Sequence, residues 1–173
     1  MTRSTGNGIT ETPSNHSVDQ TVEKLKGILQ ARGVTLFALV DHSGEAEKVG
    51  LKMPPTKLAI FGSPKAGTPL MLAAPTSAID LPLKILIWED ANGKVWVSYN
   101  APAYLQERHG IREDLLQNIA VVETLAAKAA EGTWSGRRPN RAVGGHAWRH
   151  SPECQFPPRT VSRCILTDRS AIK

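Results

Sequence analysis

LKILIWEDANGKVWVSY, which spans residues 83–99, reads as a β-hairpin. Its first half, Leu83 to Trp88, is an apolar run of strand-forming residues, and the stretch from Lys94 to Tyr99 has the same character. The turn between them contains Asn92-Gly93, a pair that favours the tight turns of hairpins. The stretch therefore predicts two antiparallel strands joined by a short connection.

Three further segments upstream of this hairpin have strand character. Val34–Val40 is rich in β-branched and aliphatic residues, and Lys57–Phe61 is a second apolar run that ends at a glycine. Gly8–Thr12 shows a short alternation of apolar and polar residues. The sequence thus predicts one strand near the N-terminus and four strands further along the chain.

Two long helices are predicted, one before and one after the four later strands along the chain. Ser17-x-x-Gln20 has the form of a capping box and opens a helix that ends at Gly33. The second long helix covers about residues 112–130 and has apolar side chains at helical spacing. Shorter helices are expected over residues 70–74, begun by Thr68-Pro69, and over residues 102–109.

The order of these elements predicts an α+β fold, a two-layer β-α-β(4)-α sandwich with short extra helices and an irregular C-terminal tail. A chain of 173 residues suits one domain plus an extension. We expect a flexible N-terminus over residues 1–7, a domain over residues 8–132 and a basic, disordered extension over residues 133–173.

The composition restricts the class of protein. Residues 134–173 hold eight of the 21 Lys and Arg and two of the 16 acids, so the net charge of +5 belongs to the tail. No apolar run approaches the roughly 18 residues of a membrane span, and the N-terminus lacks the apolar stretch of a secretory signal. With two cysteines, the chain is not a disulfide-rich secreted protein. A cytoplasmic protein without a membrane partner is expected.

The segment from Gly62 to Pro69 is the first candidate binding site. Its glycines permit close backbone approach, and the helix expected after Thr68 would direct its positive end at the loop. Lys65 is its only charged residue, so a small anionic or carbonyl-bearing ligand would fit. The alternative is a rigid corner with Lys65 in solvent. A Walker-type nucleotide site is disfavoured because Thr68 follows Gly67 without the required lysine.

Polar residues at predicted strand ends form a wider candidate set. If they converge on one cleft, they would make a ligand site. The full set of candidate ligand-binding residues is His42, Gly62, Lys65, Gly67, Thr68, Asp80, Lys84 and Glu89. An enzyme that uses His42 or His109 with a nearby carboxylate is an alternative. No catalytic residue, metal site or cofactor is assigned.

Several strings, in order, resemble the bacterial domain-of-unknown-function 302 family. They are DH at 41–42, FGSPKAGTPLM at 61–71, DLPLK at 80–84, IWED at 87–90, VWVSYN at 95–100 and RHG at 108–110. The resemblance covers about residues 8–131 and implies a TATA-binding-protein-like fold with no settled activity. Ser63 stands where relatives usually carry Asn, and the tail has no counterpart in the family pattern.

Three functional hypotheses follow. The leading one is an uncharacterised bacterial domain that acts as a homodimeric small-ligand-binding or sensing module. The second is the His42 or His109 enzyme. The third is weak, non-specific nucleic-acid binding through the basic tail, because the body of the chain has a net charge near zero and offers no specific nucleic-acid surface.

Overall fold

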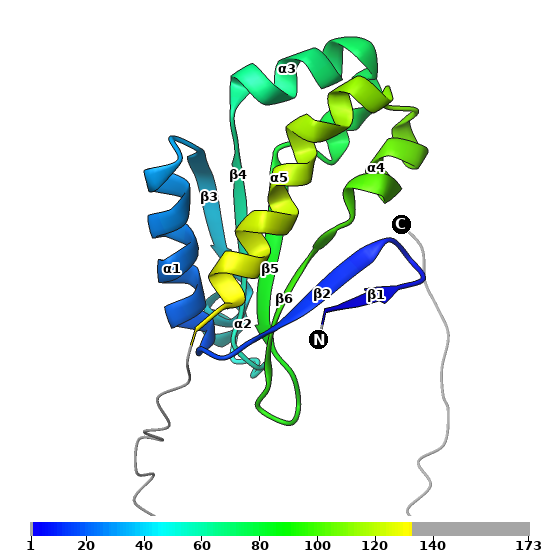
Figure 1. The fold of residues 1–173 in the computed structure, drawn as a ribbon. Helices are drawn as coiled ribbons and strands as arrows, with labels where there is room; N and C mark the ends of the chain where they lie inside the picture. The colour runs from blue at the N-terminus through cyan, green and yellow to red at the C-terminus, as the bar shows by residue number, and fades with distance from the viewer. Residues whose placement is uncertain (1, 133–173) are drawn as a thin grey trace, which may run out of the picture. The chain divides into compact units, whose positions relative to one another are not determined.

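The hairpin of residues 83–99 forms strands β5 (Leu83–Glu89) and β6 (Val95–Asn100) at the centre of the sheet (Figure 1). The structure is a computed structural model, and it describes residues 2–132. The expectation of a basic, disordered extension over residues 133–173 concerns residues outside the described part.

A six-stranded sheet surrounds this hairpin, in the order β1-β2-β6-β5-β4-β3, and every neighbouring pair is antiparallel. The remaining strands are β1 (Arg3–Thr5), β2 (Ile9–Ser14), β3 (Thr35–Asp41) and β4 (Thr56–Gly62). The register pairs Phe61 with Leu83 and Ala59 with Ile85, which places these buried side chains on one face of the sheet.

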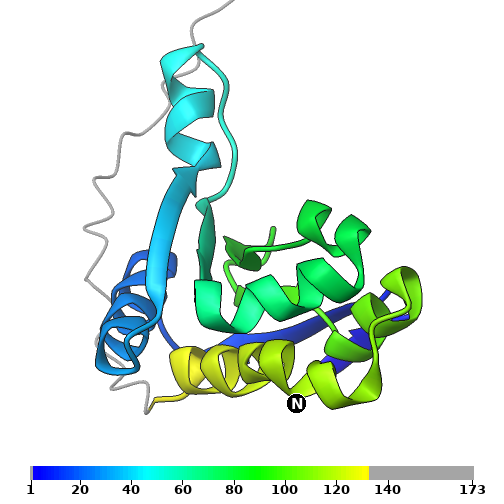
Figure 2. The same cartoon turned by 90° about the horizontal axis from the view of Figure 1, so that it is seen from above.

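The two long helices, α1 (Val18–Ala31) and α5 (Glu113–Ala130), pack together and against the sheet (Figures 1 and 2). The capping box predicted for α1 is present, because Ser17 accepts from the backbone of Gln20 and the Gln20 side chain accepts from Ser17 N–H. The shorter helices are α2 (His42–Lys48), α3 (Pro64–Ala73), α4 (Pro102–His109) and the 3-10 helix η1 (Pro75–Ile79).

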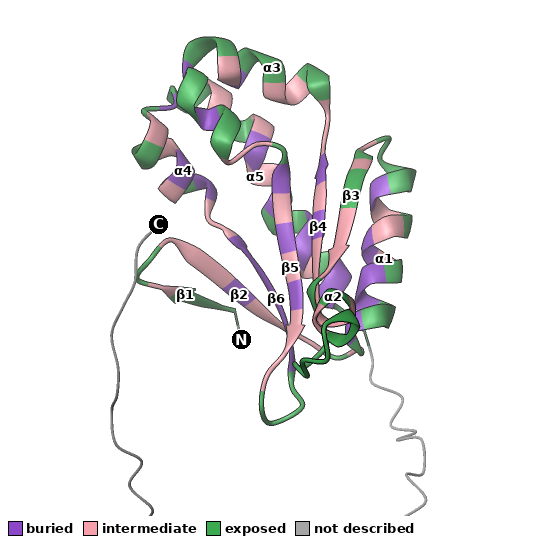
Figure 3. Ribbon diagram, turned by 180° about the vertical axis from the view of Figure 1, so that it is seen from behind, coloured by how far each residue is buried: buried purple, intermediate pink, exposed green. Residues whose placement is uncertain are grey.

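The core lies between this helical layer and the sheet, where buried residues gather on the inner faces (Figure 3). Its largest fully buried side chains are Leu25, Leu29, Phe61, Leu70, Ile85, Ile87, Ile119 and Leu125. Burying one such side chain stabilises the fold by about 1.5–3 kcal/mol. The predicted α+β, two-layer fold class and its element order are therefore confirmed.

The structure corrects the prediction for residues 62–69. Helix α3 begins at Pro64, five residues before the predicted first helical residue, Pro69, so Gly67 and Thr68 are helical and do not form a loop. Proline suits the first helical position because its fixed φ is already helical and its missing N–H is not needed there. Pro69, read from the sequence as the helix start, lies inside α3.

Two other segments differ from expectation. Residues 3–5, within the N-terminus predicted to be flexible, form strand β1 against β2. His42, expected at the end of its strand, is the first residue of α2 because Asp41 caps that helix at Gly44 N–H. Within residues 2–132, no helix is both long and apolar enough to cross a membrane.

Candidate functional site

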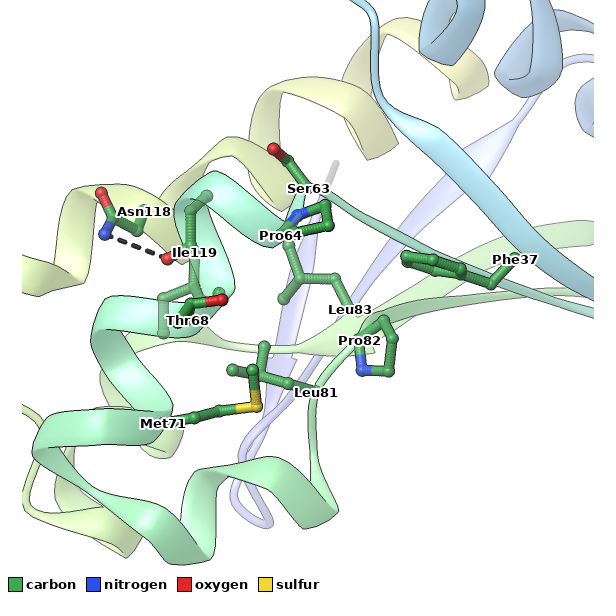
Figure 4. A pocket seen from close by; sticks show the side chains of 12 residues that line it. Phe37, Ser63, Pro64, Thr68, Met71, Leu81, Pro82, Leu83, Asn118 and Ile119 are labelled. Carbon is green, nitrogen blue, oxygen red and sulfur yellow. Dashed lines mark hydrogen bonds between the residues drawn. The ribbon is translucent and has the colours of Figure 1, made fainter.

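A pocket of about 190 Å³ lies at one end of the sheet, beneath α3 (Figure 4). It is formed by β3, α3, the start of β5 and α5, four segments that are distant in the sequence. The lining residues are Phe37, Ser63, Pro64, Ala66, Gly67, Thr68, Met71, Leu81, Pro82, Leu83, Asn118 and Ile119. We call this the α3 pocket.

Local structure positions its walls. A β-bulge between Leu36 and Ala38 leaves Phe37 out of register with β4, and its side chain is 52% exposed at the mouth of the pocket. Asn118 on α5 donates from Nδ2 to the carbonyl of Ala66, 3.2 Å away, and so ties α3 to the long helix. The opposite wall is Leu81-Pro82, which a cis peptide bond joins.

The chemistry of the α3 pocket is apolar with a few neutral polar groups. No lining residue carries a charge. The polar side chains among its lining residues are the hydroxyls of Ser63 and Thr68 and the amide of Asn118, and the amide points toward the Ala66 carbonyl (Figure 4). Ser63 precedes α3 without capping it through its side chain, so its hydroxyl is not committed to the helix. The pocket can accommodate an apolar body and pair with one uncharged polar group.

The structure brings some of the predicted ligand-binding residues to this pocket. Gly67 and Thr68 line it. Gly62 lies behind the wall, since a Cβ atom there would be 3.5 Å from Pro82 Cβ and 3.6 Å from Phe37 Cε2. Lys65 is exposed and does not line the pocket, so the charge expected to attract an anion is outside it.

Asp80 belongs to a different group, a set of polar contacts between η1 and α4. Its Oδ2 atom lies 2.7 Å from His109 Nε2 and 3.2 Å from Arg108 Nη1. The second ring nitrogen, His109 Nδ1, is 3.1 Å from Thr76 Oγ1, and the His109 side chain is only 4% exposed. Both ring nitrogens thus have partners, an arrangement that holds η1 against α4. We call these four residues the Asp80 cluster.

Lys84 lies beside the Asp80 cluster and does not line the α3 pocket. Its ammonium donates to the backbone carbonyl of Asp80 at 3.0 Å and to that of Ile79 at 3.4 Å. A cation at this place compensates the carbonyls left unpaired where a helix ends. The structure therefore gives Lys84 a role in closing η1.

The remaining predicted residues, His42 and Glu89, lie at the other end of the sheet from the α3 pocket. A seven-residue strand such as β5 spans about 20 Å, which separates the two ends. Here Asp41 accepts from Gly44 N–H and the Ser43 hydroxyl, and these bonds lower the pKa of the Asp41 carboxyl to about 2. His42 is exposed. The eight candidates therefore form three groups and not one cleft.

Sequence reasoning missed several pocket residues. Asn118 had a detectable signal, because it is a polar residue four positions before Val122, beside the apolar stripe of the last helix. Phe37 had none, since it continues an apolar strand run and only the bulge turns it outward. Within residues 2–132, no group of three or more metal-ligating side chains is present.

Comparison with known families gives this geometry a context. A family model described as "Domain of unknown function DUF302" matches residues 10–131. This chain belongs to the DUF302 family. The match covers the sheet except β1 and Ile9 of β2, together with helices α1 to α5 and the α3 pocket.

Curated relatives match this chain over a stretch of similar length. The chain is 43% identical over 119 residues to proteins named "Fluoride-specific ion channel FluC 1" from Brucella suis biovar 1 (strain 1330) and Brucella abortus biovar 1 (strain 9-941). The match covers 68% of this chain but 47% and 44% of those proteins. The chain thus spans less than half the length of the relatives it matches.

A solved structure has a similar fold. The crystal structure of an uncharacterized conserved DUF302 protein from Bacillus stearothermophilus aligns with a TM-score of 0.60 and 16% sequence identity. The alignment covers 71% of this chain and 95% of that one. The likeness confirms the fold of the DUF302 domain.

Proposed function

We propose that this DUF302 domain is a small-ligand-binding or sensing module and that the α3 pocket is its binding site. The observation that carries the proposal is a preformed apolar pocket, lined from four separate segments, with neutral polar groups in its wall. Small-molecule sites are commonly concave, mostly apolar and equipped with few polar groups that orient the ligand.

The ligand that suits this pocket is uncharged, largely apolar and carries one carbonyl group. An apolar cavity of about 150 Å³ can hold benzene, so a volume of about 190 Å³ suits a slightly larger molecule. The hydroxyls of the lining residues Ser63 and Thr68 are groups that can donate to a ligand carbonyl. An anion finds less support, because burying a charge without a partner is unfavourable.

The module is proposed to act as a homodimer in the cytoplasm. We propose no reaction for His109, since both of its ring nitrogens already have partners in the Asp80 cluster. His42 is exposed on α2 and remote from the pocket, so nothing in its surroundings supports an enzyme based on it. Nucleic-acid binding by the basic tail concerns residues outside the described part.

The relatives named as fluoride channels fit a sensing role better than a conducting one for this domain. They are about twice as long as the matched region, so a domain like this one accounts for less than half of each. A pocket lined by apolar side chains is also a poor site for fluoride, a small and strongly hydrated anion. We propose that the domain in such proteins responds to a separate ligand.

Two matched probes test the proposal. Acetophenone and benzoate share a phenyl ring, but the first has a neutral carbonyl and the second is an anion. We expect acetophenone to shift the amide NMR signals of Ser63–Thr68 and Asn118 in a saturable manner, and benzoate to bind at least tenfold more weakly. No saturable shift with either compound would contradict binding in this pocket, and tighter binding of benzoate would contradict the ligand class.

Two variants serve as controls. In Gly67→Leu, a branched side chain would occupy the pocket beside Met71 and should abolish the acetophenone shifts. Lys65→Ala removes an exposed charge outside the pocket and should leave the affinity unchanged. Native mass spectrometry of the purified protein would additionally detect a ligand retained from the cell.

A further inference from the structure

The two edges of the sheet differ in how they are protected. Edge strands expose unpaired backbone N–H and C=O groups, which proteins usually guard with shortness, charge or proline. Strand β1 has three residues and includes Arg3, so it has two of these guards. Strand β3 has seven residues, Thr35–Asp41, and no charge or proline before Asp41. The β3 edge therefore has the features of a pairing surface.

The bulge in β3 guards only part of this edge. It lies between Leu36 and Ala38, at the end of the strand near the α3 pocket. Beyond it, residues 38–41 pair regularly with residues 57–60 of β4, so this half keeps the extended form that a further strand requires. Thr35, Phe37 and Ala38 are exposed, and the segment TLFALV is apolar apart from its threonine. Such a segment is an aggregation hazard unless something covers it.

We propose that β3 pairs antiparallel with β3 of a second copy of this chain, so that two six-stranded sheets join into one. The inference rests on the homodimer of the proposed function and names its interface. A two-fold axis requires an isologous contact, and an antiparallel strand pair satisfies that symmetry. Since residues 35–40 carry no charge, two copies of this edge can meet without like-charge repulsion.

The proposed contact lies beside the candidate binding site. Phe37 belongs to the exposed edge strand and also lines the mouth of the α3 pocket. A paired strand from the second copy would run along the same segment and restrict the movement of Phe37. Ligand binding and strand pairing would then act on one side chain, which is a physical route by which the domain could sense a ligand through its assembly.

The test compares a charge placed on each edge. Ala38→Lys puts an exposed ammonium on β3, the kind of charge by which proteins guard an edge strand against pairing, and Ser4→Lys is the matched change on β1. By sedimentation velocity, the full chain and Ser4→Lys are expected at twice 18.7 kDa. Ala38→Lys is expected at 18.7 kDa, with a thermal midpoint like that of Ser4→Lys.

Hydrogen exchange adds an independent readout. Backbone amides of residues 38–41 that face the edge should exchange at least tenfold more slowly in the full chain than in Ala38→Lys. A full chain that remains monomeric at about 100 μM would overturn the proposal, because mass action favours the dimer at that concentration. A dimeric Ala38→Lys would overturn the interface. Acetophenone binding by monomeric Ala38→Lys with an affinity different from that of the full chain would support coupling through Phe37, whereas a dimer that fails to bind acetophenone would contradict only the pocket.

Discussion

The two ends of the sheet use their polar residues differently. At the end near α2, carboxylates close local turns: Asp41 caps α2, and Asp90 accepts from the backbone N–H groups of Asn92 and Lys94 in the β5–β6 turn. At the end near α3, polar groups connect segments that are distant in sequence. Asp80 contacts His109, and Asn118 contacts Ala66.

This difference shows where an open site can form. At the α2 end, the carboxylates form hydrogen bonds with backbone N–H groups a few residues away. Their hydrogen-bonding capacity is therefore met without a ligand. At the α3 end, the charged groups pair with one another in the Asp80 cluster, and the neutral Ser63 and Thr68 are left to face the α3 pocket. The charged candidates Asp80 and Lys84 therefore make structural contacts, whereas the residues that line the pocket are uncharged.

The largest expected effect is the loss of the Asp80 cluster. Asp80→Ala would leave the buried His109 ring without its carboxylate and should lower the free energy of unfolding by about 2–3 kcal/mol. A domain of this size would then melt roughly 10 °C lower. Thermal and urea unfolding measure the change, and Lys65→Ala, at an exposed site, should stay within about 0.5 kcal/mol of wild type. An Asp80→Ala protein as stable as wild type would show that the cluster is not structural.

The corresponding change at the α2 end is Asp90→Ala. This change removes the carboxylate that accepts hydrogen bonds from two backbone N–H groups and from Trp96 Nε1. The bond from Trp96 is the main cause of the lowered pKa of Asp90. Because the turn is exposed and water can replace these partners, the midpoint of thermal unfolding should fall by only a few degrees. Asn92→Ala, which keeps the backbone donor, is the control. A loss as large as that of Asp80→Ala would remove the distinction between the two ends.

A smaller effect of opposite sign is expected at Gly67. Because this residue lies inside α3, Gly67→Ala should stabilise the protein by about 0.5–1 kcal/mol. The added Cβ would meet Met71 Cε at 3.8 Å, an ordinary contact. Gly33→Ala is the matched control: its φ is +63° with open space around it, so alanine should destabilise there by about 1 kcal/mol. Destabilisation by Gly67→Ala in urea unfolding would favour the loop predicted from the sequence.

The smallest expected effect concerns acid stability at the α2 end. The pKa of Asp41 is about 2 in the folded chain, below its ordinary 3.8, so its stabilising contribution is complete above pH 3.8 and is lost as the pH falls toward 2. The contribution is small because the side chain is 41% exposed. Asp41→Asn retains the cap without the titration. The melting midpoint of Asp41→Asn should fall less than that of wild type between pH 4 and pH 2. Equal falls in the two proteins would show that the titration of Asp41 does not cause the acid sensitivity.

Local signals were sufficient for most elements of the fold. The capping box at Ser17, the Asn92-Gly93 turn and the apolar period of α5 each act within a few residues, so their physics is contained in short stretches of sequence. Helix α3 is the exception, because its two prolines offer two possible starts. Packing of Leu70 in the core and the Asn118–Ala66 contact accompany the start at Pro64.

The candidate site depended on contacts that no short stretch contains. The sequence by itself determined the fold class, the family and the residue types available at each strand end, because periodicity, caps and turns are local. Only the tertiary structure decided that Asp80 meets His109, that Lys65 lies outside the α3 pocket and that Phe37 and Asn118 line it. These pairings join residues 29 to 81 positions apart along the chain, and side-chain chemistry at one position does not specify a partner at such a distance.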